Sequence, residues 1–198
     1  ISAGFDFVTR GYVTVYFMDK EKLKGLEQRN LLEQWKQSLP SRDFISITTS
    51  GPVRVGMSVG SQPVGVSPQD NTGPTLGMSF DNAGGGKIRK INSVGLYLPK
   101  GLFIKDVNGL VDVAQKISCA DIPDEKDCDD DAIEVYSITL PREGVELVSL
   151  RIHTLINDYG ALVGSGATSV GKKMWAMVLY EYELEKEKSF SIRVPVTM

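Results

Sequence analysis

The sequence has few of the residues that build metal centres and redox sites. Its 198 residues include one histidine, His153, and two cysteines, Cys119 and Cys128. A site that needs two histidines is therefore excluded, and the two thiols alone make a weak zinc site, because tetrahedral zinc takes four ligands. No group of side chains combines a nucleophile, a base and an orienting partner at a recognisable spacing. We therefore expect a protein that is not an enzyme.

Long apolar runs and an excess of positive charge are also missing. No stretch approaches the roughly 20 apolar residues that span a membrane. Lysine and arginine number 22 against 25 aspartates and glutamates, which gives a net charge of −3. This balance removes the long-range attraction to phosphate on which sequence-independent nucleic-acid binding depends. We expect neither a membrane span nor a nucleic-acid partner.

What the sequence does have is a series of short strand patterns separated by turn residues. There are 20 glycines and 9 prolines, and the strand patterns between them have the spacing of a sandwich or barrel. After Pro40 no run of ten or more residues has a helical period, which argues against βαβ units. We expect a mainly β, antiparallel β-sandwich. The predicted strands cover residues 12–18, 44–49, 52–59, 75–80, 87–98, 133–140, 145–156, 174–184 and 190–196.

Two elements near the ends of the chain can be predicted more specifically. Asp19 is expected to cap one helix over residues 20–39, which Pro40 ends. At the other end, strands 174–184 and 190–196 are joined by four charged residues. The second of these strands alternates apolar and polar side chains, so the pair predicts a closing antiparallel hairpin.

We expect residues 1–10 to form an extended segment. It precedes a single sandwich domain that covers residues 11–198. Ala3, Phe5 and Phe7 alternate with other residues and share one face. We expect these side chains to serve in assembly, because Ser2–Thr9 has the length and pattern of a strand donated to a neighbouring copy. The alternative is that the segment pairs within its own sheet.

A row of tyrosines near the end of the chain can also be interpreted either as an assembly surface or as part of the protein's own core. Tyr180 and Tyr182 share a strand face with Ala176 and Val178. Such a row can pack against a neighbouring subunit or against the protein's own core.

The segment between the two cysteines is rich in carboxylates. Cys119 and Cys128 lie nine positions apart in a turn-rich stretch, so we expect a local disulfide and an oxidising compartment; two free thiols are the alternative. Asp127, Asp129 and Asp131 have the alternate spacing of a calcium loop, although the turn glycine and the bidentate glutamate are missing. A calcium ion and a solvated acidic loop remain alternative interpretations, and no other cofactor is expected.

Two further motifs have structural explanations. Gly166–Lys173 nearly fits the phosphate-binding pattern of glycine, four residues, and Gly-Lys-Ser/Thr. Lys173 replaces the hydroxyl, and a strand pattern follows where a helix is required. His153 lies mid-strand on a face with Ser149 and Arg151, which predicts a solvent-facing histidine.

Several local patterns taken together resemble one class of proteins. They are Ser50–Val64, Phe80–Gly86, Val94–Leu102, Tyr180–Lys186 and Ser191–Val194. In pattern and order they are similar to the immunoglobulin-like β-sandwich portions of archaeal cell-surface and pilin-like exported proteins, over residues 51–196. The resemblance implies an exported sandwich displayed at the cell surface, without enzyme activity.

The sequence therefore favours a non-enzymatic extracellular structural protein, a subunit of a cell-surface filament or pilus-like homopolymer built by strand donation. One alternative is a monomeric surface-binding or adhesion module with a calcium-stabilised acidic loop. Another is a viral coat or tail protein. Residue 1 is isoleucine, so we expect either a processed or a trimmed chain, and the removal of an export signal is left open.

Overall fold

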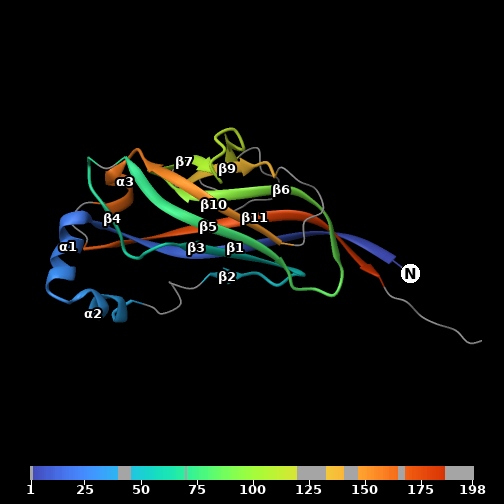
Figure 1. The fold of residues 1–198 in the computed structure, drawn as a ribbon, viewed down its shortest axis with the longest axis horizontal. Coiled ribbons are helices and arrows are strands. Elements are labelled where there is room, and N and C mark those ends of the chain that lie inside the picture. Colours follow the sequence, from blue (N-terminus) through green and yellow to red (C-terminus); the bar gives the residue numbers. More distant parts are fainter. Residues whose placement is uncertain are drawn as a thin grey trace, which may run out of the picture.

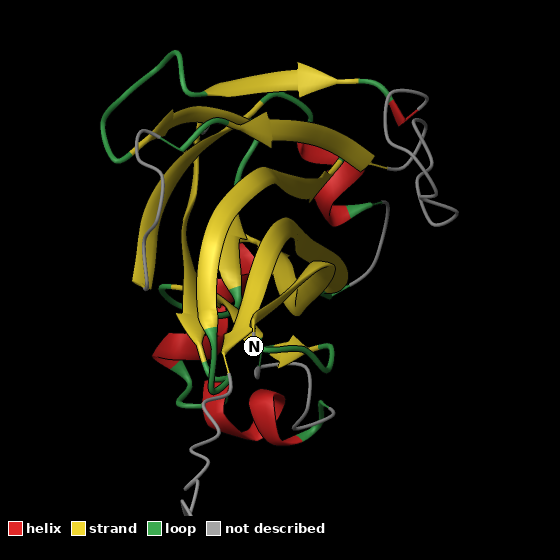
Figure 2. Ribbon diagram, turned by 90° about the vertical axis from the view of Figure 1, so that its right-hand side faces the viewer, coloured by secondary structure: helices red, strands yellow, loops and turns green. Residues whose placement is uncertain are grey.

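Two β-sheets packed face to face make up most of the molecule. The computed structural model describes residues 2–39, 46–69, 71–119, 133–140, 147–164 and 168–185, and at 147 and 148 only the backbone. The strands curve around a common interior (Figure 2), and the helices α1, α2 and α3 lie at the end of the long axis opposite the start of β1 (Figure 1). The mainly β, antiparallel prediction is confirmed at this level.

The larger sheet has seven strands, of which β1 and β11 are the longest. All its pairs are antiparallel except β1 with β4. Along the sheet the order is β2 (Ile47–Thr48), β1 (Ser2–Asp19), β11 (Val170–Glu185), β6 (Lys87–Pro99), β9 (Ile133–Ile138) and β8 (Ala114–Ile117), with β4 (Val64–Val66) beside β1.

The smaller sheet has four antiparallel strands and covers the inner face of the larger one. Its order is β3 (Val53–Val59), β5 (Thr72–Asn82), β10 (Leu147–Ile156) and β7 (Leu102–Val107). The order is non-sequential in both sheets, so strands distant in the chain lie side by side. Strands β4, β7 and β8 were not predicted, because they are short and lack clean alternation.

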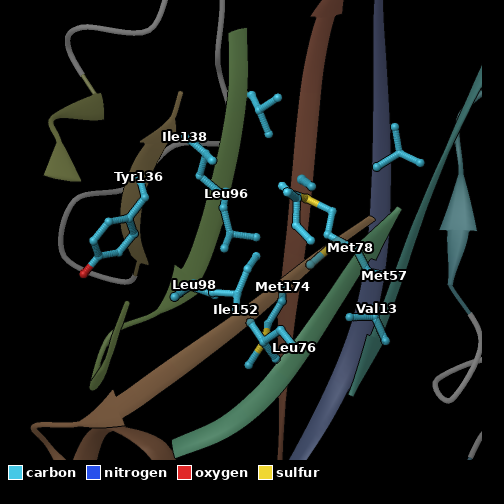
Figure 3. Close-up of a cluster of buried hydrophobic side chains, with 14 of the residues drawn as sticks. Val13, Met57, Leu76, Met78, Leu96, Leu98, Tyr136, Ile138, Ile152 and Met174 are labelled. Carbon is cyan, nitrogen blue, oxygen red and sulfur yellow. The ribbon is translucent and has the colours of Figure 1, made fainter. Parts of the chain in front are cut away.

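Apolar side chains from both sheets form the core between them. Those at alternate positions of β1, β5, β6 and β10 point inward, as period-two patterns require. Figure 3 shows part of this core, in which side chains of the two sheets meet. The labelled residues are Val13, Met57, Leu76, Met78, Leu96, Leu98, Tyr136, Ile138, Ile152 and Met174.

The helical insertion near the start differs from the single helix predicted over residues 20–39. Asp19 caps α1 (Lys20–Gln28) as expected, accepting hydrogen bonds from two backbone N–H groups of the first turn. The helix then stops, because Asn30 has a φ of 56° and the N–H of Leu31 bonds the carbonyl of Leu26. This is a Schellman ending with asparagine in the left-handed position. A second helix, α2 (Leu32–Gln37), follows.

Two other predictions need correction or extension. A short unpredicted helix, α3 (Tyr159–Val163), follows β10, so the helical insertion near the start is not the only one. The predicted closing hairpin on residues 174–184 is wrong, because β11 already pairs with β1 on one edge and β6 on the other. Its proposed partner, residues 190–196, lies outside the described residues.

Candidate functional site

The segment predicted to serve in assembly is the first part of β1. This strand runs without interruption from Ser2 to Asp19, so the extended segment at 1–10 and the first sandwich strand are one element. From Ser2 to Phe17 it pairs antiparallel with β11 of the same chain. Of the two alternatives for Ser2–Thr9, the structure therefore has the strand within its own sheet.

The predicted assembly side chains Ala3, Phe5 and Phe7 lie on the inner face of the larger sheet, in a row that leads out of the core. The Phe7 ring stacks on Tyr180, with centroids 5.9 Å apart, and meets the edge of Tyr182 at 6.1 Å. Phe5 lies 6.2 Å beyond Phe7 and is 47% exposed. The row therefore begins as core and ends as accessible apolar surface.

Tyr180 and Tyr182 pack inside their own chain. The Tyr180 hydroxyl lies 3.0 Å from Thr9 Oγ1 and accepts from the N–H of Val53 at 3.2 Å. The Tyr182 hydroxyl accepts from the N–H of Gly86 at 2.7 Å and donates to Asn82 Oδ1 at 3.1 Å. Both side chains therefore tie the larger sheet to strands or turns of the smaller one.

One edge of β1 is open over its first residues. Backbone groups of Arg10, Thr14 and Tyr16 bond Thr49 or Gln62 on the side away from β11. Successive residues of a strand point their backbone N–H and C=O groups to opposite edges, so the even-numbered residues of β1 point these groups away from β11. Before Arg10, no described residue pairs with the backbone on that edge. Within the described parts of the chain, Ser2–Val8 therefore presents a strand edge without a partner.

This open edge carries apolar side chains on both faces of the strand. Val8 is 45% exposed on the outer face, and Leu184 of β11 is 46% exposed beside Ala3. Figure 1 shows the start of β1 and the end of β11 extending together at one end of the long axis. The only charged side chain in Ser2–Val8 is Asp6.

The edge of β3 is closed by contrast, because side-chain hydroxyls occupy its outward N–H groups. Each of the three donors finds an oxygen from another element within 3.3 Å. The donor and acceptor pairs are Val53 with Tyr180, Val55 with Thr48, and Met57 with Ser46. The edge of β3 is thus protected by hydroxyl groups, whereas the described residues supply no such cover along Ser2–Val8 of β1.

Another polar feature is a hydrogen-bonded histidine–aspartate pair on the outer face of the smaller sheet. His153 Nδ1 lies 2.7 Å from Asp106 Oδ1, and the N–H of Gly109 donates to the same oxygen at 3.0 Å. The hydrogen bond from His153 lowers the pKa of Asp106, while burial opposes the shift. The ionised carboxylate only accepts, so Nδ1 carries the proton and Nε2 of a neutral ring is left as an acceptor.

His153 lines a shallow depression of about 310 Å³ together with Thr75, Lys105 and Thr154. Thr75 and Asp106 are its register partners on the two flanking strands, so the three side chains form a row across β5, β10 and β7. The His153 side chain is 41% exposed. The prediction of a solvent-facing strand histidine is therefore confirmed in part, and its carboxylate partner was missed because 47 residues separate them in sequence.

The predicted disulfide and calcium site are not settled by the described residues. Cys119 packs against the outer-face cluster formed by Tyr97 and Trp175, whose rings stack 4.8 Å apart. Cys128 lies outside the described part of the chain, as do Asp127, Asp129 and Asp131. In the residues that are described, no group of three or more metal-ligating side chains occurs. Both predictions stay open.

Comparisons of the chain with protein-family models, with curated proteins and with solved structures find no significant match. None of the described helices has the length and apolar character needed to cross a bilayer. Proposals about function therefore depend on the geometry of the open β1 edge and of the His153 depression.

Proposed function

We propose that this protein is a non-enzymatic structural subunit that assembles with copies of itself at the cell surface. The observation that carries the proposal is the open, apolar edge of Ser2–Val8, at the end of a strand whose remaining length is paired. Unpaired backbone donors and acceptors on such an edge favour addition of another strand. The resemblance to immunoglobulin-like domains of archaeal pilin-like proteins supports an extracellular location.

Strand addition at this edge is the preferred form of assembly over the predicted strand donation. Donation would require β1 to leave β11 and pair with β11 of a neighbour, which exchanges identical contacts along Ser2–Phe17. Addition leaves these contacts intact and uses only groups that have no partner among the described residues. It also brings Phe5 and Leu184 against apolar surface.

Electron microscopy of native material and sedimentation velocity of the purified chain test this proposal. We expect filaments or other multi-copy assemblies and a weight-average mass that rises with concentration. A closed particle of many copies would indicate the viral coat or tail protein instead. A chain that remains monomeric at high micromolar concentration would contradict the structural role.

A binding module is the second candidate, because the depression beside Lys105 and Thr75 offers the Nε2 atom of His153, for which the described residues supply no hydrogen-bond partner. Thermal melts with small carboxylic acids, sugars and divalent cations would test it, with His153→Ala as the matched variant. A ligand that binds the native state raises the melting temperature by mass action. A binding function at this depression is supported only if an additive raises the melting temperature of the natural chain and not that of His153→Ala. A chelator that lowers the melting temperature of both would support calcium elsewhere.

A further inference from the structure

The open edge of β1 has the symmetry needed to pair with itself. It begins at Ser2 and ends at Val8, because the backbone of Arg10 is already bonded to Thr49. The centre of this stretch is Phe5. We propose that two copies of this chain associate through Ser2–Val8 as antiparallel neighbours, related by a two-fold axis at Phe5. The contact presupposes the self-assembly proposed above and identifies one surface that mediates it.

Backbone geometry limits the registers that such a pair can take. Residues whose backbone N–H and C=O groups point away from β11 must lie opposite residues of the same kind in the other copy. The two-fold axis therefore passes midway between the two copies of one residue. An axis at Asp6 would place two carboxylates opposite each other, each already beside Glu181 of β11. An axis at Gly4 or nearer the start would place Val8 beyond the end of the other copy's β1, which begins at Ser2. An axis at Phe5 pairs Gly4 with Asp6 and uses the whole stretch.

The side chains fit this register on both faces. The two Phe5 residues form a non-hydrogen-bonded pair, in which Cα atoms approach to about 4.5 Å and side chains are closest. Each Ala3 lies opposite Phe7 of the second copy, so small and large side chains alternate on the inner face. On the outer face Asp6 meets Gly4, which adds no charge or bulk. The apolar row that leaves the core at Phe7 thereby continues into the second copy.

In this arrangement β2 does not lie in the way of the second copy. The antiparallel direction places β2 of each copy, which pairs with Gly11 and Tyr12, beyond the start of the other copy's β1. The larger sheets of the two copies then join into one continuous sheet. This contact is isologous and closes on itself, so a filament requires a second, different contact.

Cysteine cross-linking of the full chain tests the register. In Phe5→Cys the two introduced thiols face each other at a distance a disulfide can span, so mild oxidation should give a covalent dimer. The matched control is Ala3→Cys on the same face, where the thiols of the two copies lie about four strand residues apart, or about 13 Å. It should remain unlinked, as should the unmodified chain.

Charge substitution tests the contact without oxidation. Phe5→Lys places two like charges on the two-fold axis and should weaken dimerisation at least about tenfold, as measured by sedimentation equilibrium. Val111→Lys is the control, because Val111 is 66% exposed and lies in the β7–β8 loop away from the edge. It should leave the dimerisation constant unchanged. Far-UV circular dichroism confirms that both variants fold.

The outcomes separate this contact from the proposed function. If native assemblies form but Phe5→Cys does not cross-link, or if Ala3→Cys links equally well, the Phe5-centred pairing is wrong and the structural role stands. Cross-linking of Phe5→Cys without any larger assembly supports the pairing and contradicts the filament. Unchanged dimerisation of Phe5→Lys also overturns the pairing, because the two copies then associate through another surface.

Discussion

At the scale of single residues, the tyrosine hydroxyls of β11 connect the two sheets. Tyr180 has no exposed surface, and its hydroxyl meets Thr9 from β1 and the backbone of Val53 from β3. A buried polar atom that loses its partner is costly, because water cannot replace the lost hydrogen bond. These hydroxyls are therefore structural, and their effect is on stability.

Tyr180→Phe should lower the free energy of unfolding by about 1–3 kcal/mol, because it leaves the N–H of Val53 and the hydroxyl of Thr9 without their acceptor or donor. Urea denaturation measures the change. Thr9→Val provides the second arm of a double-mutant cycle. Because Tyr180 and Thr9 share a hydrogen bond, the double variant should be less destabilised than the sum of the two single changes.

The His153–Asp106 pair makes stability depend on pH. Because the folded pKa of Asp106 is lowered, mainly by the hydrogen bond from His153, its ionised form stabilises the fold above the ordinary aspartate pKa of about 3.9. This contribution is lost as the pH falls through the lowered value. Asp106→Asn should therefore be less stable than the natural chain at neutral pH, and the two should converge in strong acid.

Urea denaturation at a series of pH values checks this convergence. Asp112→Asn is the control, because Asp112 is an exposed carboxylate in the β7–β8 loop. Its curve should follow that of the natural chain at every pH. A constant difference between Asp106→Asn and the natural chain down to the most acidic pH would show that the ionised Asp106 is not the cause.

At the scale of elements, β1 is held closely against β3 at one position. A Cβ atom on Gly11 would lie 2.4 Å from the carbonyl oxygen of Val55. Glycine is therefore required for the two strands to approach as they do. On the same strand, a Cβ on Gly4 would meet nothing within 4 Å.

Gly11→Ala should lower the free energy of unfolding by about 1–3 kcal/mol, because the sheets must separate locally to admit the methyl group. Gly4→Ala is the matched control on the same strand. It should be neutral or slightly stabilising, since alanine restricts the unfolded chain without a clash. Equal effects at the two positions, measured by chemical denaturation, would argue against the close contact at Gly11.

Some of the strands and helices could be predicted from sequence patterns, and others could not. Short strand patterns between turn residues at 12–18, 75–80 and 87–98 predict strands that are present. The helix break at Asn30 was missed, since asparagine is only a weak stop signal until Leu31 closes the Schellman turn. The predicted hairpin failed because hairpins assume that sequential strands pair, whereas β11 lies between β1 and β6.

At the scale of the whole molecule, the two sheets are one cooperative structure. The core cluster contains residues of both sheets, and the Tyr180 and Tyr182 hydroxyls bridge them. Neither sheet can unfold without exposing the inner face of the other. Strong mutual burial of this kind favours a single, two-state transition.

The variant Trp35→Phe tests this cooperativity, because it leaves Trp175 of the larger sheet as the only tryptophan. Unfolding followed by Trp175 fluorescence should coincide with unfolding followed by far-UV circular dichroism. Trp35 belongs to α2, which has no buried residue, so its replacement should cost little stability. Two separated transitions would show that the larger sheet unfolds independently of the rest.

The sequence by itself determined the class of the fold, since alternation, turn residues and the lack of helical periods after Pro40 are local properties of the chain. It also singled out Ala3, Phe5 and Phe7. Only the tertiary structure decided that β1 pairs with β11 and so leaves Ser2–Val8 as an open edge. It likewise brought His153 to Asp106. Pairing between distant segments depends on strand order, and strand order is fixed by how both sheets bury their faces together.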